Sequence, residues 1–136
     1  MMTIPKTLYD EMLAHAQAEH PNECCGLLAG QGSSSGGEVT KLYRMNNTHH
    51  SPVSYFMEPR EQFRVFKEVR AEGTELLAIY HSHPHTVAYP SSTDVGLAYY
   101  PEAVYLIISL EERDRPVVKA YRIVEGQITP EPLEII

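Results

Sequence analysis

The sequence predicts a single α/β or α+β domain spanning residues 1–136, with a mixed central β-sheet of about six strands flanked by about three helices. Three observations support this fold class. The length of 136 residues suits one domain, because domains usually hold about 100–200 residues. Hydrophobic residues make up 43% and charged residues 21%, as is usual in globular proteins. Short apolar runs bounded by turn residues alternate with stretches of helical periodicity.

The first predicted element is a helix between two prolines. Pro5 suits the first turn of a helix, because the missing N–H of proline would have no partner there. Leu8, Met12 and Leu13 follow at the spacing of one apolar helix face, and Pro21 ends the helix.

Two strands and an irregular stretch are expected next. Residues 24–30 form a short apolar run bounded by turn residues, which is typical of a buried strand. Residues 31–37 are rich in serine and glycine and predict a flexible loop, after which residues 39–45 alternate loosely as a second strand. Residues 46–59 contain two prolines and are expected to be irregular.

Residues 60–72 predict a second helix. Phe63, Phe66 and Val69 lie on one face at helical spacing and are expected to pack on the sheet. Gly73 supplies the residue that commonly ends a helix.

The rest of the chain predicts further strands and one short helix. Residues 76–80 are expected to form a strand that leads into a histidine-rich motif, and residues 92–99 a short helix. Closing strands are expected over residues 103–109, 116–124 and 127–133.

Charge and composition argue against several classes of function. The net charge is −7 and no basic stripe is present, so neither nucleic acid nor an anionic membrane is an expected partner. The longest apolar run, residues 103–108, is far shorter than the ~20 residues that span a bilayer, and the N-terminus lacks the apolar region of a signal peptide. Cys24 and Cys25 are adjacent and suit no disulfide framework, so we expect a reducing, cytoplasmic location.

The strongest chemical signal is a pair of histidines at the end of a predicted strand. His81 and His83 are two residues apart and therefore project from the same face of the strand. With Asp94 they offer two nitrogens and one carboxylate oxygen, which is the ligand set of a catalytic zinc site. The Ser91-x-x-Asp94 motif is equally typical of a helix capping box, so the role of Asp94 stays open at this point.

The full pattern resembles the JAMM (MPN-type) zinc metallopeptidases, in their compact prokaryotic form. Glu23 is followed far downstream by His81-Ser82-His83, seven further residues, and then Ser91-Ser92-Thr93-Asp94. The likeness extends over about residues 3–125 and implies a single MPN domain with a cytidine-deaminase-like fold.

The resemblance also implies a role for each motif residue. His81, His83 and Asp94 would bind one Zn²⁺ per chain, with water as the fourth ligand at a pKa of about 7. Glu23 would act as the general base and pass the proton to the leaving amine. Ser91 would donate its hydroxyl to the oxyanion.

The implied activity is hydrolysis of the amide bond after the C-terminal Gly-Gly of a ubiquitin-like or sulfur-carrier protein, with release of cysteine or of a conjugate. A homodimer is left open. One alternative is a non-catalytic MPN scaffold, and another is a cysteine peptidase that uses Cys25 and a histidine. A zinc deaminase is disfavoured, because the chain lacks the Pro-Cys-x-x-Cys ligands of that class.

The remaining candidate residues have simpler interpretations. Cys24 and Cys25 are expected to be small buried hydrophobic residues. Residues 55–57 could either line a groove for an extended peptide or pack in the core. Three further histidines are expected on exposed loops: His49, His50 and His85.

Overall fold

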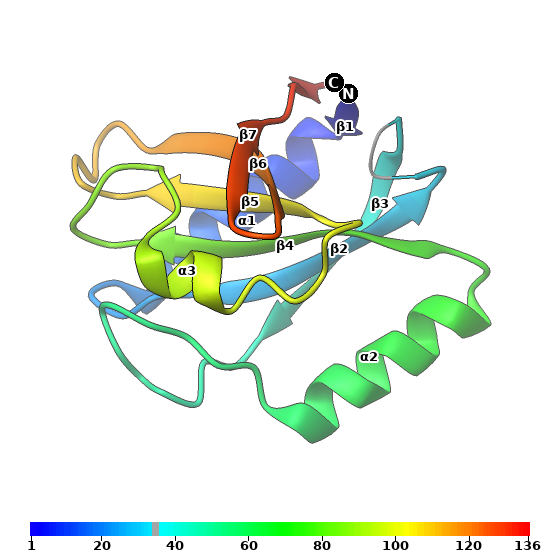
Figure 1. Cartoon of the computed structure of the whole chain (residues 1–136), viewed down its shortest axis with the longest axis horizontal. Helices are drawn as coiled ribbons and strands as arrows, with labels where there is room; N and C mark the ends of the chain where they lie inside the picture. The colour runs from blue at the N-terminus through cyan, green and yellow to red at the C-terminus, as the bar shows by residue number, and fades with distance from the viewer. Residues whose placement is uncertain (34–35) are drawn as a thin grey trace.

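The computed structural model describes residues 1–33 and 36–136. Within these residues the chain forms three helices and one mixed sheet of eight strands (Figure 1). In chain order the elements are β1 (Met2–Ile4), α1 (Lys6–Glu19), β2 (Cys25–Gln31), β3 (Glu38–Met45), α2 (Pro59–Ala71), β4 (Glu75–His83), α3 (Ser92–Gly96), β5 (Val104–Ser109), β6 (Val117–Val124), β7 (Gln127–Pro130) and β8 (Leu133–Ile135). Ser34 and Ser35 of the predicted 31–37 loop lie outside the described residues.

The strand order β7-β6-β5-β4-β2-β3-β1-β8 places β4 in the interior of the sheet. β4 pairs antiparallel with β2 and parallel with β5, so both of its edges are hydrogen-bonded. β1 and β8 pair in parallel, which brings the two chain ends together, as Figure 1 shows. The strand that carries the two motif histidines is therefore held on both sides.

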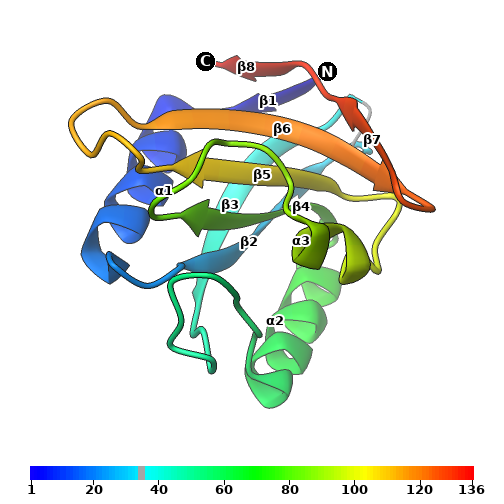
Figure 2. The same ribbon diagram turned by 60° about the vertical axis from the view of Figure 1, so that its left-hand side comes forward.

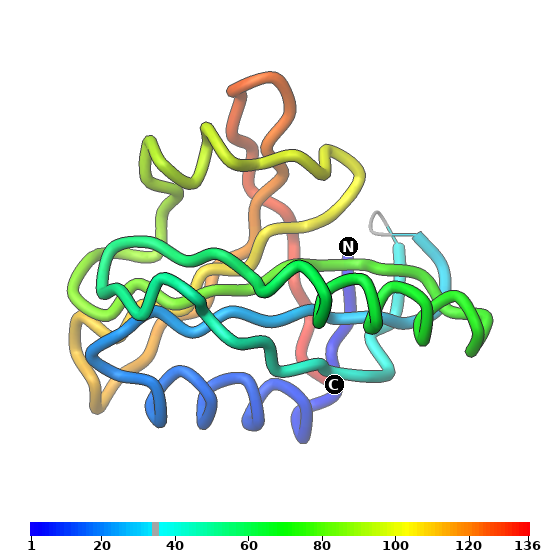
Figure 3. The backbone as a smooth tube through the Cα atoms, turned by 90° about the horizontal axis from the view of Figure 1, so that it is seen from below, coloured from blue at the N-terminus to red at the C-terminus, as the bar shows by residue number. Residues whose placement is uncertain are grey.

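The helices cover the two faces of the sheet separately (Figures 2 and 3). α1 packs on one core, while α2 and α3 lie over the other. Successive strand residues alternate between these cores, because strand side chains have a period of two. On β2, Leu28 joins the α1 side and Leu27 the α2 side, and on β4 the same holds for Tyr80 and Ile79.

The predicted fold class is confirmed, but the sheet has more strands than expected. β1 was not predicted, because three residues before a helix show no periodicity. The expected strand 127–133 is two strands on opposite edges of the sheet, with β7 on β6 and β8 on β1. The described residues contain no helix with the length and apolar character needed to cross a bilayer.

The predicted apolar face of α2 is wrong at one position. Phe63 is 65% exposed, and the residues that α2 buries are Val65 and Val69. α2 touches the sheet mainly at β3 and β4, so a narrow stripe of side chains makes the contact. The Lys67 ammonium lies 5.6 Å from the centre of the Phe63 ring and covers part of it.

A buried histidine–tyrosine pair lies on the α1 face. Nδ1 of His15 and the hydroxyl of Tyr80 share a hydrogen bond of 2.7 Å. Burial lowers the pKa of His15 to about 4, with a smaller contribution from Arg44, so the imidazole is neutral at neutral pH. The Tyr80 ring lies directly against Gly26, where any Cβ would collide with it.

Candidate metal and active site

Three ligand atoms converge at the end of β4. Nε2 of His81 and Nε2 of His83 lie 3.2 Å apart, and Oδ2 of Asp94 lies 3.1 Å from the former and 2.9 Å from the latter. Ligand atoms around a tetrahedral zinc ion, at about 2.0–2.1 Å from the metal, are about 3.3 Å from one another. The spacing and the donor set of these side chains therefore fit a zinc ion.

Asp94 is positioned by the start of its own helix. Oγ of Ser91 accepts a hydrogen bond from the Asp94 backbone N–H at 3.0 Å, and Oδ2 of Asp94 accepts one from the Ser91 N–H at 2.9 Å. The capping box that the sequence suggested is therefore present, and its carboxylate is also the one that faces the histidines. Since Oγ of Ser91 acts as an acceptor here, its hydroxyl proton remains available to another group.

The two histidines differ in what holds the second ring nitrogen. Nδ1 of His83 lies 2.8 Å from the backbone oxygen of Val87, so Nδ1 carries the proton and the lone pair of Nε2 faces the site. Nδ1 of His81 is buried and has no hydrogen-bond partner within the described residues. The ring of His81 is therefore not oriented by a hydrogen bond between Nδ1 and any of the described residues.

The electrostatics of the three residues suit a cation. Burial raises the pKa of Asp94, but hydrogen bonds from His81 and His83 outweigh it and hold this pKa well below its usual range. Burial lowers the pKa of His81. Burial also lowers the pKa of His83, yet contacts with Asp94 and the Val87 oxygen raise it overall. The carboxylate stays ionised and attracts positive charge to the point between the rings.

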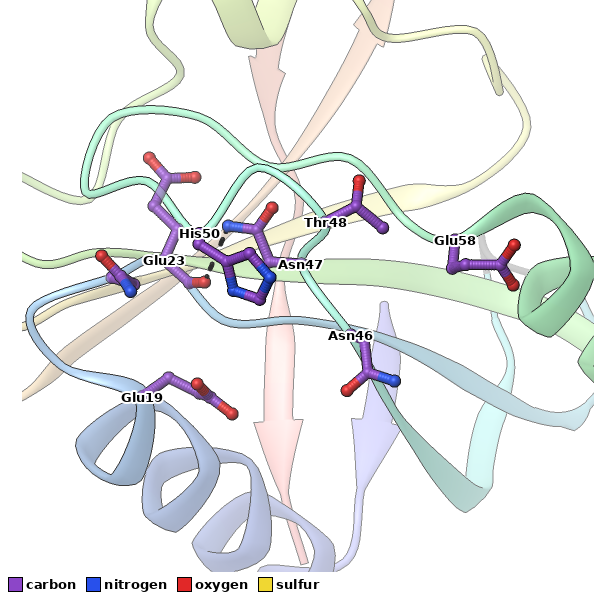
Figure 4. Close-up of a pocket in the computed structure, with 8 residues that line it drawn as sticks. Glu19, Glu23, Asn46, Asn47, Thr48, His50 and Glu58 are labelled. Carbon is purple, nitrogen blue, oxygen red and sulfur yellow. Dashed lines mark hydrogen bonds between the residues drawn. The ribbon is translucent and has the colours of Figure 1, made fainter.

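Glu23 lies two residues before β2 begins at Cys25. Cys25 pairs with His81 across the antiparallel β2–β4 ladder, so Glu23 lies toward the end of β4 that carries His83, whose charge acts on the Glu23 carboxyl group. Its backbone N–H donates to the oxygen of Ser51 at 2.8 Å, which anchors this turn. In Figure 4 the Glu23 carboxylate points away from Glu19, and both residues line a polar cavity.

One carboxyl oxygen of Glu23 is buried and has no hydrogen-bond partner among the described residues. The residue is 4% exposed, and Oε1 has no hydrogen-bond partner in the described part of the chain. Burial raises the pKa of Glu23 to about 8, while His83 lowers it and Asp94 raises it. A carboxyl group that exchanges its proton near neutral pH suits general acid–base chemistry.

Asn47 is a contributor to which the sequence analysis assigned no role. Its Nδ2 donates to the backbone oxygens of Glu23 at 3.1 Å and Ser54 at 3.0 Å, and its Oδ1 accepts from the N–H of Phe56 at 3.1 Å. Figure 4 shows the link to Glu23. The only available signal was an asparagine in an irregular, proline-containing segment, where this residue type often bonds to the backbone.

The 55–57 segment packs in the core and also lines an apolar cavity. The Tyr55 ring stacks on His81, with centres 4.7 Å apart and planes at 27°, and it also packs against the core. Met57 is buried, whereas Phe56 is 50% exposed. All three line an apolar cavity of about 190 Å³, closed on the other side by residues that include Tyr99. Packing in the core is therefore present, together with an apolar cavity beside the ring that stacks on His81, and the binding of an extended peptide there stays a prediction.

The cysteines are buried, as expected. Cys24 is 1% and Cys25 0% exposed. Burial raises the pKa of the Cys24 thiol to about 12 and also raises that of Cys25. A buried, protonated thiol lacks the reactivity that a cysteine peptidase requires, so this alternative loses support. The three further histidines are exposed, as predicted: His49, His50 and His85.

Comparison with known families identifies the fold. A family model described as prokaryotic homologs of the JAB domain matches residues 5–124. The chain belongs to the prokaryotic JAB family. This confirms the resemblance to the JAMM (MPN-type) proteins in their compact prokaryotic form, and the matched range includes every residue of the motif.

Relatives of this JAB protein match nearly all of its length. The CysO-cysteine peptidase of Mycobacterium tuberculosis (strain H37Rv) is 38% identical over 136 residues, covering 100% of this chain and 92% of the relative. A Thermus thermophilus protein named "Probable TtuB-protein conjugate cleaving protease" is 34% identical over 128 residues, covering 93% and 79%. The solution structure of a Desulfitobacterium hafniense protein is similar at a TM-score of 0.91, with 41% identity and coverage of 100% and 93%.

Proposed function

We propose that this JAB-family protein is a zinc-dependent hydrolase that cleaves the amide bond after the C-terminal Gly-Gly of a ubiquitin-like or sulfur-carrier protein. The observation that carries the proposal is the convergence of the ligand atoms of His81, His83 and Asp94 within 3.2 Å. The chain is a hydrolase of peptide or isopeptide bonds that acts on a conjugate of such a carrier, in keeping with the names of its relatives. Its two buried thiols suit a reducing, cytoplasmic location.

The proposed cofactor is one zinc ion held by His81, His83 and Asp94. Two imidazole nitrogens and one carboxylate oxygen form a ligand set that zinc favours and that leaves one position open. When bound, zinc supplies Lewis-acid activation of water and of a carbonyl group.

The chain itself supplies the proton transfers and an oxyanion donor. The Glu23 carboxylate would take a proton from the attacking water and later donate it to the leaving amine. A cation beside it favours the ionised form, which offsets the effect of burial on its pKa. The Ser91 hydroxyl, whose oxygen already accepts a hydrogen bond from the Asp94 N–H, would donate a hydrogen bond to the developing oxyanion.

The recessed position of the ligands supports a Gly-Gly substrate. The side chains of His81, His83 and Asp94 are 1%, 5% and 9% exposed, so a scissile carbonyl must enter deeply to reach them. Glycine lacks a Cβ and allows the backbone to approach closely. The group released beyond Gly-Gly is a cysteine or a larger conjugate, and the folded body of the carrier adds remote binding energy that short peptides lack.

The test uses the ubiquitin-like carrier encoded in the same genome, extended by one residue beyond Gly-Gly. Intact mass should show conversion to the Gly-Gly form, and a chelator should stop it until zinc is added back. Replacing the penultimate glycine of the substrate by valine should slow cleavage at least about tenfold, since the added side chain blocks the approach. Equal rates on both substrates, or no cleavage of a Gly-Gly carrier by zinc-loaded protein, would refute the Gly-Gly assignment and leave the assignment as a metallohydrolase intact.

A further inference from the structure

The two histidines of the site are supported unequally. His83 has its second ring nitrogen bonded to the Val87 oxygen at 2.8 Å, whereas Nδ1 of His81 has no partner in the described residues. A histidine that binds metal usually has its other nitrogen hydrogen-bonded, which fixes the orientation of the ring. For His81, therefore, no hydrogen bond at Nδ1 within the described residues holds the imidazole plane.

We infer that Tyr55 is the positioning residue for His81, and that it holds the imidazole plane by stacking; this inference rests on the proposed metal site. The two rings lie nearly parallel, at 27°, with centres 4.7 Å apart. His83 meets the same imidazole edge-on, at 63° and 5.0 Å, and so limits tilting from another direction. Stacking restrains the plane of the ring, and the contact of Nε2 with Asp94 then determines which edge faces the site.

Hydrogen bonds from the Asn47 side chain hold the backbone on either side of Tyr55. The Asn47 amide bonds to the Ser54 oxygen and to the Phe56 N–H, the backbone groups on either side of Tyr55. The same amide bonds to the backbone oxygen of Glu23. One side chain thus ties the segment that carries the stacking ring to the residue proposed as general base.

The surroundings of Tyr55 explain why a ring is needed at this position. One side of the ring contacts His81, while other parts of it pack against the core and line the apolar cavity. Removing the ring would open space beside the imidazole, and no hydrogen bond would replace its restraint. An aromatic side chain without a hydroxyl would preserve the contact, because stacking depends on the ring face.

The experiment measures zinc affinity, by competition with a chromogenic chelator, in three variants. Tyr55→Leu should raise the zinc dissociation constant about tenfold or more, the range found when a supporting partner of a metal ligand is lost. Tyr55→Phe should stay within about threefold of the parent, since the ring remains. Phe56→Leu is the matched control: Phe56 is a neighbouring aromatic residue that stacks on His49, so zinc affinity should not change.

A spectroscopic readout separates positioning from a general loss of stability. With Co²⁺ in place of zinc, the visible absorption reports ligand geometry, and it should change in Tyr55→Leu but not in Tyr55→Phe. Tyr55→Met, a flexible apolar replacement, serves if the leucine variant does not fold, with the same expected loss. Parent-like affinity and spectrum in the folded leucine or methionine variant would overturn the inference, as would an equal loss in Tyr55→Phe. Failure of the parent and of Phe56→Leu to bind zinc would refute the proposed metal site as well.

Discussion

The two faces of the sheet each bury a histidine beside a tyrosine, with different results. β4 contributes Tyr80 to the α1 side, where it meets His15, and His81 to the opposite side, where it meets Tyr55. Both imidazoles are buried, at 3% and 1% exposure. The first pair is edge-on at 81° and joined by a hydrogen bond, whereas the second is stacked at 27°.

The difference lies in the neighbouring ligand atoms rather than in burial. His15 has its hydrogen bond to Tyr80, and the carboxylate of Glu19 lies 3.9 Å from its other ring nitrogen. His81 has a second imidazole and a carboxylate within 3.2 Å of the same nitrogen. A buried histidine therefore indicates a metal site only where further ligand atoms converge on it, and His15 has a structural role.

Removing a ligand on one face should have the largest effect. His81→Ala or Asp94→Ala should lose the zinc, about one ion per chain in the parent, because one of three protein ligands is gone. His15→Ala should keep the zinc while unfolding more readily. Atomic absorption on gel-filtered protein measures this contrast. Full zinc content in both ligand variants would contradict the assignment.

Substitution of Glu23 should affect catalysis without affecting metal binding. Glu23→Gln keeps the size of the side chain and removes the base, so turnover of the carrier should fall by roughly 10²–10⁴ with zinc retained. Tyr80→Phe, on the opposite face, should lose stability and keep its turnover per folded molecule. Initial rates by mass spectrometry provide the measurement, and a Glu23→Gln variant as active as the parent would return Glu23 to a structural role.

The His15–Tyr80 pair should make stability depend on pH. The pKa of His15 falls from an ordinary 6.5 to about 4 on folding, so the unfolded chain binds more protons between these values. The contribution of neutral His15 to the free energy of unfolding is complete above pH 6.5 and is lost as the pH falls toward 4. It amounts to at most about 3 kcal/mol. Urea unfolding at about pH 7.5 and 5 gives the free energy of unfolding at each pH. The loss of this free energy between the two pH values should be smaller in His15→Gln than in the parent, by up to about 2 kcal/mol. An unchanged difference would argue against a neutral His15.

Cys25 should give the smallest effect. It pairs with His81 across the ladder, but its thiol is buried and protonated. Cys25→Ser should therefore leave turnover within a few-fold of the parent in protein that folds and holds zinc. Loss of turnover in such protein, together with sensitivity of the parent to thiol reagents, would revive the cysteine-peptidase alternative.

Local patterns were enough to predict most of the fold. Periodicity placed the first two helices and the interior strands, because side-chain direction repeats every 3.6 residues in a helix and every two in a strand. The predictions were wrong where the partner decides the structure. The short strands β1 and β8 form because they hydrogen-bond to each other. Phe63 is exposed because α2 faces the sheet with Val65 and Val69 instead.

The candidate site shows the same distinction between local patterns and long-range contacts. The sequence by itself determined which residues are the proposed ligands, because two histidines at i and i+2 share a strand face and the Ser91-x-x-Asp94 box directs its carboxylate locally. Only the tertiary structure decided that Oε1 of Glu23 is buried without a hydrogen-bond partner in the described residues, and that Tyr55 stacks on His81. These features depend on segments far apart in the chain. Their geometry follows from how loops pack on the sheet, and local sequence periodicity does not specify that packing.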